Sequence, residues 1–194
     1  NLDEQALASL PCMDLPLEPS LEQPLRLGFL GKEWERKGGP FVLSVAEALR
    51  RIGIPAVVRA IGPSVQALPD SPLLQPLGFI SKQTAMAEFV RELRSWHFGT
   101  LFSSCEAFGI SNRECLRLGI PVLAHATGGI PSTFTGLGCG HLFPSYPSAE
   151  HVAHWIQEQL TPYSRYLGLR AGLVDRSAEF SWIAAVEQLQ EILG

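Results

Sequence analysis

The chain has 194 residues, of which 46% are hydrophobic and 18% are charged, and its formal net charge is -4. This size and apolar content suit one domain with a large core, and the negative charge argues against a general nucleic-acid binder. No apolar run approaches the roughly 20 residues that a membrane span needs. The four cysteines are scattered without a Cys-x-x-Cys pair, so the sequence predicts neither a zinc site nor a disulfide framework. A reducing cytoplasm is therefore the expected setting.

Residues 1–24 differ in composition from the rest, with four prolines among acidic residues. This pattern predicts an extended, acidic interdomain connector, and residues 25–194 then form the folded domain. We therefore expect a further domain ahead of this chain in the complete protein.

The next segments alternate between strand and helix patterns. Residues 25–30 and 55–61 are predicted strands, and the apolar stripe of residues 41–52 predicts the helix between them. A strand, a crossover helix and a second strand make the unit of a parallel sheet. A short strand at 77–80 and a helix at 82–96, with Ser81 as its N-cap, continue the pattern.

The loop after the first strand contains Gly31, Lys32 and Lys37. It lacks both the Gly-x-Gly-x-x-Gly fingerprint of dinucleotide sites and the Gly-x-x-x-x-Gly-Lys pattern of P-loops. Its lysines remain candidates for binding an anion.

The stretch from Cys105 to Glu114 is the most informative. The run 98–103 predicts a buried strand, and residues 110–118 predict a short helix that ends at Gly119. Ligands bind at the carboxyl ends of strands in such sheets, where helix N-termini suit phosphate. Since carboxylates repel phosphate, we expect Glu106 and Glu114 to accept hydrogen bonds from sugar hydroxyls instead.

Two glutamates separated by seven residues, with Phe108-Gly109 after the first, resemble the signature of retaining glycosyltransferases of the GT-B fold, the group 1 or family 4 type. The pairs Gly31-Lys32 and Lys37-Gly38 and the run 128–131 (Gly-Gly-Ile-Pro) are similar to further motifs of that family. The resemblance covers about residues 25–190. It implies a Rossmann-like, doubly wound parallel α/β sheet that forms the C-terminal, donor-binding half of a GT-B enzyme.

The resemblance also implies roles for particular residues. Glu106, Lys37 and Lys32 take the catalytic positions, and no metal ligand is implied. The donor-binding positions are Gly31, Lys32, Lys37, Ile80, Glu106, Gly109, Ile110, Ser111 and Glu114. Two positions depart from the family pattern, since Lys32 replaces the usual arginine and Ser132 replaces the usual glutamate.

The implied reaction transfers a sugar from a nucleoside diphosphate sugar with retention of configuration and without a cofactor. The other domain would complete the cleft and provide any contact with a membrane surface. Two alternatives stay open: a sugar-nucleotide epimerase domain and a non-catalytic nucleotide-sugar-binding domain. His151 and His154 stand one helical turn apart, but no acid or cysteine completes a metal site around them.

Overall fold

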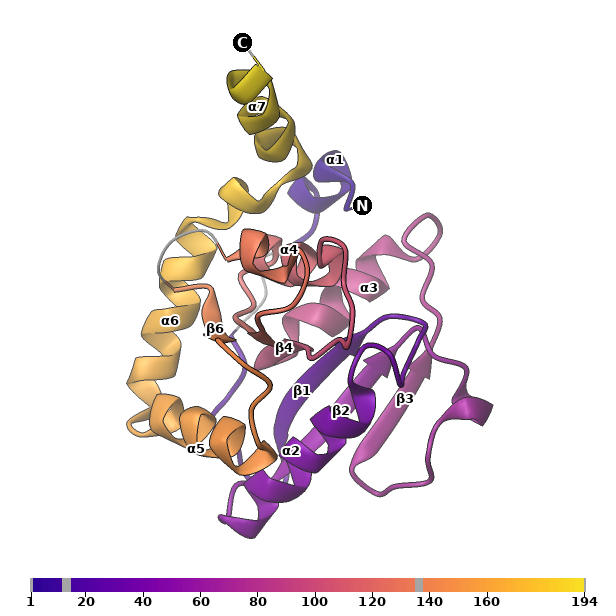
Figure 1. The fold of residues 1–194 in the computed structure, drawn as a ribbon, viewed down its shortest axis with the longest axis vertical. Coiled ribbons are helices and arrows are strands. Elements are labelled where there is room, and N and C mark those ends of the chain that lie inside the picture. The colour runs from indigo at the N-terminus through magenta and orange to yellow at the C-terminus, as the bar shows by residue number, and fades with distance from the viewer. Residues whose placement is uncertain (1, 12–14, 135–137, 194) are drawn as a thin grey trace.

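The computed structural model describes residues 2–11, 15–134 and 138–193, and a six-stranded parallel sheet forms its centre (Figure 1). The strands are β1 (Leu25–Leu30), β2 (Ala56–Ile61), β3 (Leu74–Gly78), β4 (Phe98–Leu101), β5 (Val122–His125) and β6 (Gly140–Phe143). Their order is β3-β2-β1-β4-β5-β6. The order reverses between β1 and β4, which is where a doubly wound sheet opens a crevice at its carboxyl edge. The predicted Rossmann-like fold class is confirmed.

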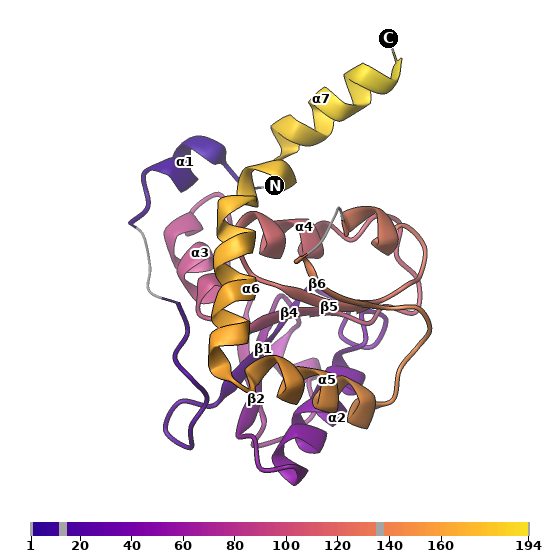
Figure 2. The same cartoon turned by 90° about the vertical axis from the view of Figure 1, so that its left-hand side faces the viewer.

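Helices cover both faces of the sheet (Figure 2). One face carries α2 (Gly39–Arg51) and α5 (Ala149–Leu160), and the other carries α3 (Met86–Arg94) and α4 (Ile110–Arg117). The helix α6 (Tyr163–Asp175) has buried residues in the clusters of both faces. The helix α7 (Trp182–Leu193) extends away from the sheet. Single 3₁₀ turns lie at η1 (Val65–Ala67), η2 (Ile130–Thr133) and η3 (Ser177–Phe180).

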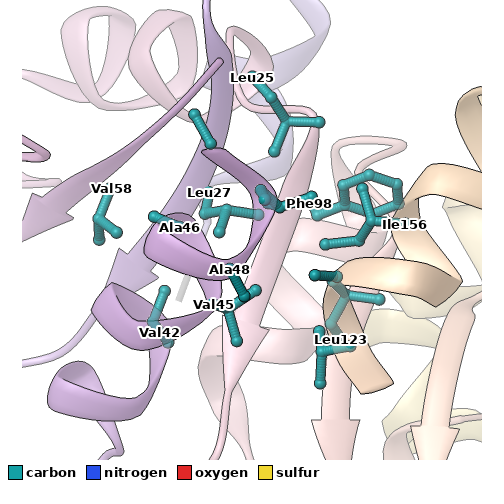
Figure 3. Packing of buried hydrophobic residues seen from close by; sticks show 14 of the residues in the cluster. Leu25, Leu27, Val42, Val45, Ala46, Ala48, Val58, Phe98, Leu123 and Ile156 are labelled. Carbon is teal, nitrogen blue, oxygen red and sulfur yellow. The ribbon is translucent and has the colours of Figure 1, made fainter. Parts of the chain in front are cut away.

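Alternate residues of each strand feed the two cores. Leu123 packs with α2 and α5, whereas its neighbours Val122 and Ala124 pack with α3 and α4. Figure 3 shows the first of these cores, in which Leu27 lies beside the valines of α2. Both faces of a doubly wound sheet are covered, which explains why its central strands are mostly apolar rather than alternating between apolar and polar residues.

The predicted helix at 82–96 begins later than expected, at Met86. Ser81 does not cap it. Its hydroxyl accepts from the Thr84 amide at 3.4 Å, and its carbonyl accepts from the Ala85 amide at 2.8 Å, so residues 81–85 form a turn. Hydrogen bonding by serine competes with helix initiation. As a result Lys82 lies on a turn beside the carboxyl edge of the sheet.

The connector predicted for residues 1–24 is not extended throughout. Asp3 caps a short helix, α1 (Glu4–Ala8), and Leu7 is buried against the α3 and α4 core. The described residues 15–24 form neither helix nor strand. The division into connector and domain stays a prediction. No helix in the described part of the chain has both the length and the apolar character to cross a bilayer.

Candidate functional site

Two helix N-termini meet the carboxyl edge of the sheet at the reversal point. Gly38 caps α2 after β1, and Gly109 caps α4 after β4, with left-handed φ angles of 78° and 83°. Neither cap has a side-chain hydrogen bond. A Cβ on Gly38 would lie 2.3 Å from the Phe102 carbonyl oxygen, so glycine lets α2 start directly against the end of β4. The first N–H groups of a helix lack intrahelical acceptors and favour an anion.

An ion pair joins these two loops. The Lys37 ammonium donates to Glu106 Oε2 at 3.1 Å, and the Ser103 hydroxyl donates to the same oxygen at 3.3 Å. The side chains of Lys37 and Glu106 are only 15% and 13% exposed. Partial burial raises the pKa of Glu106, but the hydrogen bond and charge of Lys37, the charge of Arg36 and the Gly109 backbone lower it further below the usual value. Glu106 is therefore an ionised acceptor beside two helix N-termini.

Arg36 ties the Lys37 loop to the Glu106 loop. Its guanidinium donates to the Cys105 carbonyl at 2.6 Å and to Glu33 Oε2 at 2.6 and 2.9 Å, and it lies 3.8 Å from Glu106 Oε2. Its own carbonyl accepts from the Ser104 amide at 2.9 Å. These contacts hold the two loops in one arrangement. Arg36 is not among the site residues predicted from the sequence, although it directly precedes Lys37.

The third wall of the site is the loop after β5. A Cβ on Gly128 would lie 1.9 Å from the Glu106 carbonyl oxygen, and one on Gly129 would lie 2.0 Å from the Ala107 carbonyl oxygen. The Gly129 amide donates to the Glu106 carbonyl at 3.0 Å. Only glycine permits this approach, so the two glycines hold the backbone that directly follows the Glu106 side chain.

Glu114 lies further along α4 and is 4% exposed. Its Oε1 forms a short ion pair with the ammonium of Lys82, which is 31% exposed. Lys82 also lies 5.3 Å from the centre of the Phe89 ring. Lys82 is not among the site residues predicted from the sequence, because the apolar pattern of residues 82–96 places it in a helix. Its position after a predicted strand, at the edge where ligands bind, was the available signal.

The remaining predicted residues occupy the same edge with different surroundings. A Cβ on Gly31 would lie 2.3 Å from Cδ of Lys37, so this glycine gives the lysine its path. Lys32 lies 5.5 Å from the centre of the exposed Phe79 ring. Ile80 packs on the α3 and α4 core. The structure therefore brings Lys37 and Glu106 together, whereas Lys32 lies beside Phe79, which follows β3.

At the start of α4, Ile110 is 46% exposed and faces solvent in part. Ser111 is buried, and within the described residues its hydroxyl has no hydrogen-bond partner. A buried hydroxyl without a partner costs stability. Among the described residues, no group of three His, Cys, Asp or Glu side chains could hold a metal ion.

Comparison with known families and proteins shows what the sequence and the fold are similar to. Residues 75–167 match the family model described as "Glycosyl transferases group 1". The D-inositol 3-phosphate glycosyltransferase of Corynebacterium aurimucosum is 34% identical over 87 residues, which cover 45% of this chain and 20% of that protein. D-inositol 3-phosphate glycosyltransferase 1 of Catenulispora acidiphila is 27% identical over 180 residues, covering 83% of this chain and 42% of that protein. The chain spans less than half the length of these relatives.

Solved structures share the fold at low identity. Anabaena HepE in complex with UDP-glucose has a TM-score of 0.65 at 16% identity, over 88% of this chain and 48% of that one. Sucrose-phosphate synthase of Thermosynechococcus elongatus has a TM-score of 0.66 at 21% identity, over 97% of this chain and 47% of that one. The C-terminal domain of a group 1 family protein, LpcC, of Francisella tularensis has a TM-score of 0.61 at 17% identity, over 83% of this chain and 92% of that one. The resemblance to group 1 glycosyltransferases and to the GT-B type of fold is confirmed.

Proposed function

We propose that this chain, whose residues 75–167 carry the group 1 glycosyl transferase sequence on half of a GT-B fold, is the donor-binding domain of a glycosyltransferase. The proposed donor is a nucleoside diphosphate sugar, and the proposed reaction retains the anomeric configuration. The observation that carries the proposal is the Lys37–Glu106 pair at the reversal point of the sheet. It sets a cation and a hydroxyl acceptor side by side, as the two ends of a sugar diphosphate require.

The chemistry of each group follows from where charge develops. When the glycosidic bond breaks, the leaving diphosphate gains negative charge and the sugar becomes oxocarbenium-like. Positive groups placed in advance lower that barrier. We assign this role to Lys37, to Lys32 and to the first N–H groups of α4, from Gly109 to Ser111. These groups supply positive charge without a metal, so we propose metal-independent transfer.

In this proposal Glu106 accepts hydrogen bonds from hydroxyl groups of the donor sugar. Its lowered pKa keeps it ionised at neutral pH, and an ionised carboxylate makes stronger hydrogen bonds than an amide. Glu114 accepts hydrogen bonds from the ribose hydroxyls, and the main chain near Ile80 lies against the nucleotide base. The transferred group is proposed to be a hexosyl unit.

The second wall of the cleft is assigned to another domain of the complete protein. The coverage of the relatives supports this, because the aligned part of the Catenulispora enzyme is 42% of its length. Any contact with a membrane surface would belong to that domain. We also propose a cytoplasmic setting, supported by the unpaired thiols of Cys105 and Cys115.

Two measurements test the proposal. Calorimetry of the 194-residue chain with UDP, GDP and ADP is expected to show binding of at least one diphosphate, well above that of its nucleoside. A transfer assay on the same chain is expected to show no turnover. Efficient transfer by this chain alone would contradict the half-enzyme assignment, and the absence of any diphosphate binding would contradict the donor site. In the complete protein, an inverted product or an epimerised nucleotide sugar would overturn the assigned reaction.

A further inference from the structure

All three lysines of the chain lie at one edge of the sheet. Lys32 and Lys37 are in the loop after β1, and Lys82 is in the turn after β3. The other twelve cationic side chains of the chain are arginines. Lys37 and Lys32 have assigned roles at the diphosphate. Lys82 does not, yet it contacts a residue that the proposed function assigns to the ribose.

The two side chains of the Lys82–Glu114 ion pair differ in their exposure to solvent. Glu114 projects from α4 and is almost fully buried, whereas nearly a third of the Lys82 side chain reaches solvent. A buried carboxylate needs a counter-charge to stay ionised. Lys82 supplies that charge, and its partly exposed ammonium lies at the carboxyl edge of the sheet, where ligands of such folds bind. The Phe89 ring lies beneath its ammonium and limits the positions it can take.

We propose that Lys82 is a specificity-determining residue that, together with Glu114, reads a ribose hydroxyl. This inference rests on the proposed function and deepens it. A hydroxyl group both donates and accepts, a carboxylate only accepts, and an ammonium only donates through its three N–H groups. Lys82 keeps its bond to Oε1 of Glu114. The ribose hydroxyl donates to Oε2 and accepts a second N–H of Lys82.

A deoxy position cannot make this arrangement. Without the hydroxyl, Glu114 loses one hydrogen bond, and the second N–H of Lys82 loses its acceptor while the bound nucleotide excludes water. Sites built to hydrogen-bond a hydroxyl discriminate strongly against analogues that lack it. The pair therefore selects ribonucleotide donors over deoxyribonucleotides. A purely structural ion pair would stabilise α4 but would not distinguish the two.

The test compares ligands as well as variants. The variants are Lys82→Met, which removes the charge, and Lys82→Arg, which keeps it. Arg51→Met is the matched control because Arg51 pairs with Glu150 at an exposed site at the far end of α2. Each protein is titrated by calorimetry with UDP, 2′-deoxy-UDP and 3′-deoxy-UDP at fixed ionic strength, or with the same series of the preferred base.

The wild type is expected to prefer UDP to at least one deoxy analogue by about ten- to a hundredfold, the range for a charge-assisted hydrogen bond. Lys82→Met is expected to weaken UDP and leave that analogue nearly unchanged, so that the preference shrinks. Lys82→Arg should restore part of it, and Arg51→Met should keep all of it. If Lys82→Met weakens all three ligands by one factor, the inference is overturned. If the wild type binds no nucleotide, the proposed function itself fails.

A second readout does not depend on Lys82→Met folding. With ¹³C at the lysine Cε, the wild type gives three signals because it has three lysines. The loss of a signal in Lys82→Arg assigns Lys82. UDP is expected to shift the signals of all three lysines, whereas 2′,3′-dideoxy-UDP should shift only those of Lys32 and Lys37, which are assigned to the diphosphate. Equal shifts of the Lys82 signal by both ligands would overturn the inference.

Discussion

Replacement of Glu106 by glutamine is expected to move two affinities in opposite directions. In the free protein, Glu106 holds the Lys37 ammonium at 3.1 Å, and both side chains are largely buried. A diphosphate must compete for that ammonium and approach a carboxylate of its own sign. Glu106→Gln removes both obstacles, while the amide keeps the shape of the side chain.

The magnitudes follow from the two kinds of contact. Release of Lys37 is expected to strengthen UDP binding by about 0.5–1.5 kcal/mol, roughly two- to tenfold. For the UDP sugar, Glu106→Gln also removes hydrogen bonds between sugar hydroxyls and a charged acceptor, which are worth about 1.5–3 kcal/mol. After the gain at the diphosphate is subtracted, the sugar donor should bind more weakly by about 1 kcal/mol, roughly eightfold, and by at most about seventyfold.

Lys37→Met completes the comparison. It should weaken UDP and the UDP sugar alike by about ten- to a hundredfold, since both contain the diphosphate, and should leave uridine unchanged. The double variant tests whether the two residues act through each other, because neighbours in one network do not add.

The assay is calorimetry of wild type, both single variants, the double variant and Arg51→Met with uridine, UDP and one UDP sugar. GDP and ADP series replace these ligands if UDP is not the tightest. A loss of UDP affinity in Glu106→Gln equal to the loss for the sugar donor would refute the separate roles of Lys37 and Glu106. An equal loss of uridine and UDP in Lys37→Met would place Lys37 away from the phosphates.

Three further perturbations test the surroundings of the site. Glu114→Gln is expected to weaken ribonucleotides about ten- to a hundredfold and 2′,3′-dideoxynucleotides much less by calorimetry; equal losses would make Glu114 structural. Gly128→Ala puts a Cβ 1.9 Å from the Glu106 carbonyl at a φ of 50°, so it should lower the melting temperature and weaken the sugar donor more than the diphosphate; unchanged values would show that the loop shifts freely. Burial and the charges of Arg26 and Arg170 lower the pKa of His97 to about 4, although the hydrogen bond with the Leu17 carbonyl opposes this shift. Because the unfolded histidine takes up its proton first, near pH 6.5, stability should fall by roughly 3 kcal/mol from pH 6.5 to pH 4, and urea titrations of His97→Gln should show less of this fall.

Much of the architecture is legible in the sequence. Strand and helix patterns alternate with glycines at the boundaries, and this predicts a parallel sheet because each apolar strand must be covered on both faces. The four strands predicted at 25–30, 55–61, 77–80 and 98–103 lie within a few residues of the observed ones. The start of the helix predicted at 82–96 is the main local error. Ser81 accepts hydrogen bonds from the amides of Thr84 and Ala85 and so forms a turn, which the apolar stripe of the helix does not indicate.

The candidate site divides in the same way. The resemblance to group 1 glycosyltransferases predicts Lys37, Glu106 and Glu114 as site residues, and the carboxyl ends of neighbouring strands bring them to one edge of the sheet. Which of them touch was decided by tertiary structure. Gly38 lets α2 begin against the end of β4, and this contact sets Lys37 beside Glu106, 69 residues later in the chain. Lys82 lies in the turn after β3, and it pairs with Glu114 only because folding brings that turn beside α4. Local sequence determines which elements form, whereas pairs of charges from distant segments depend on how those elements pack together.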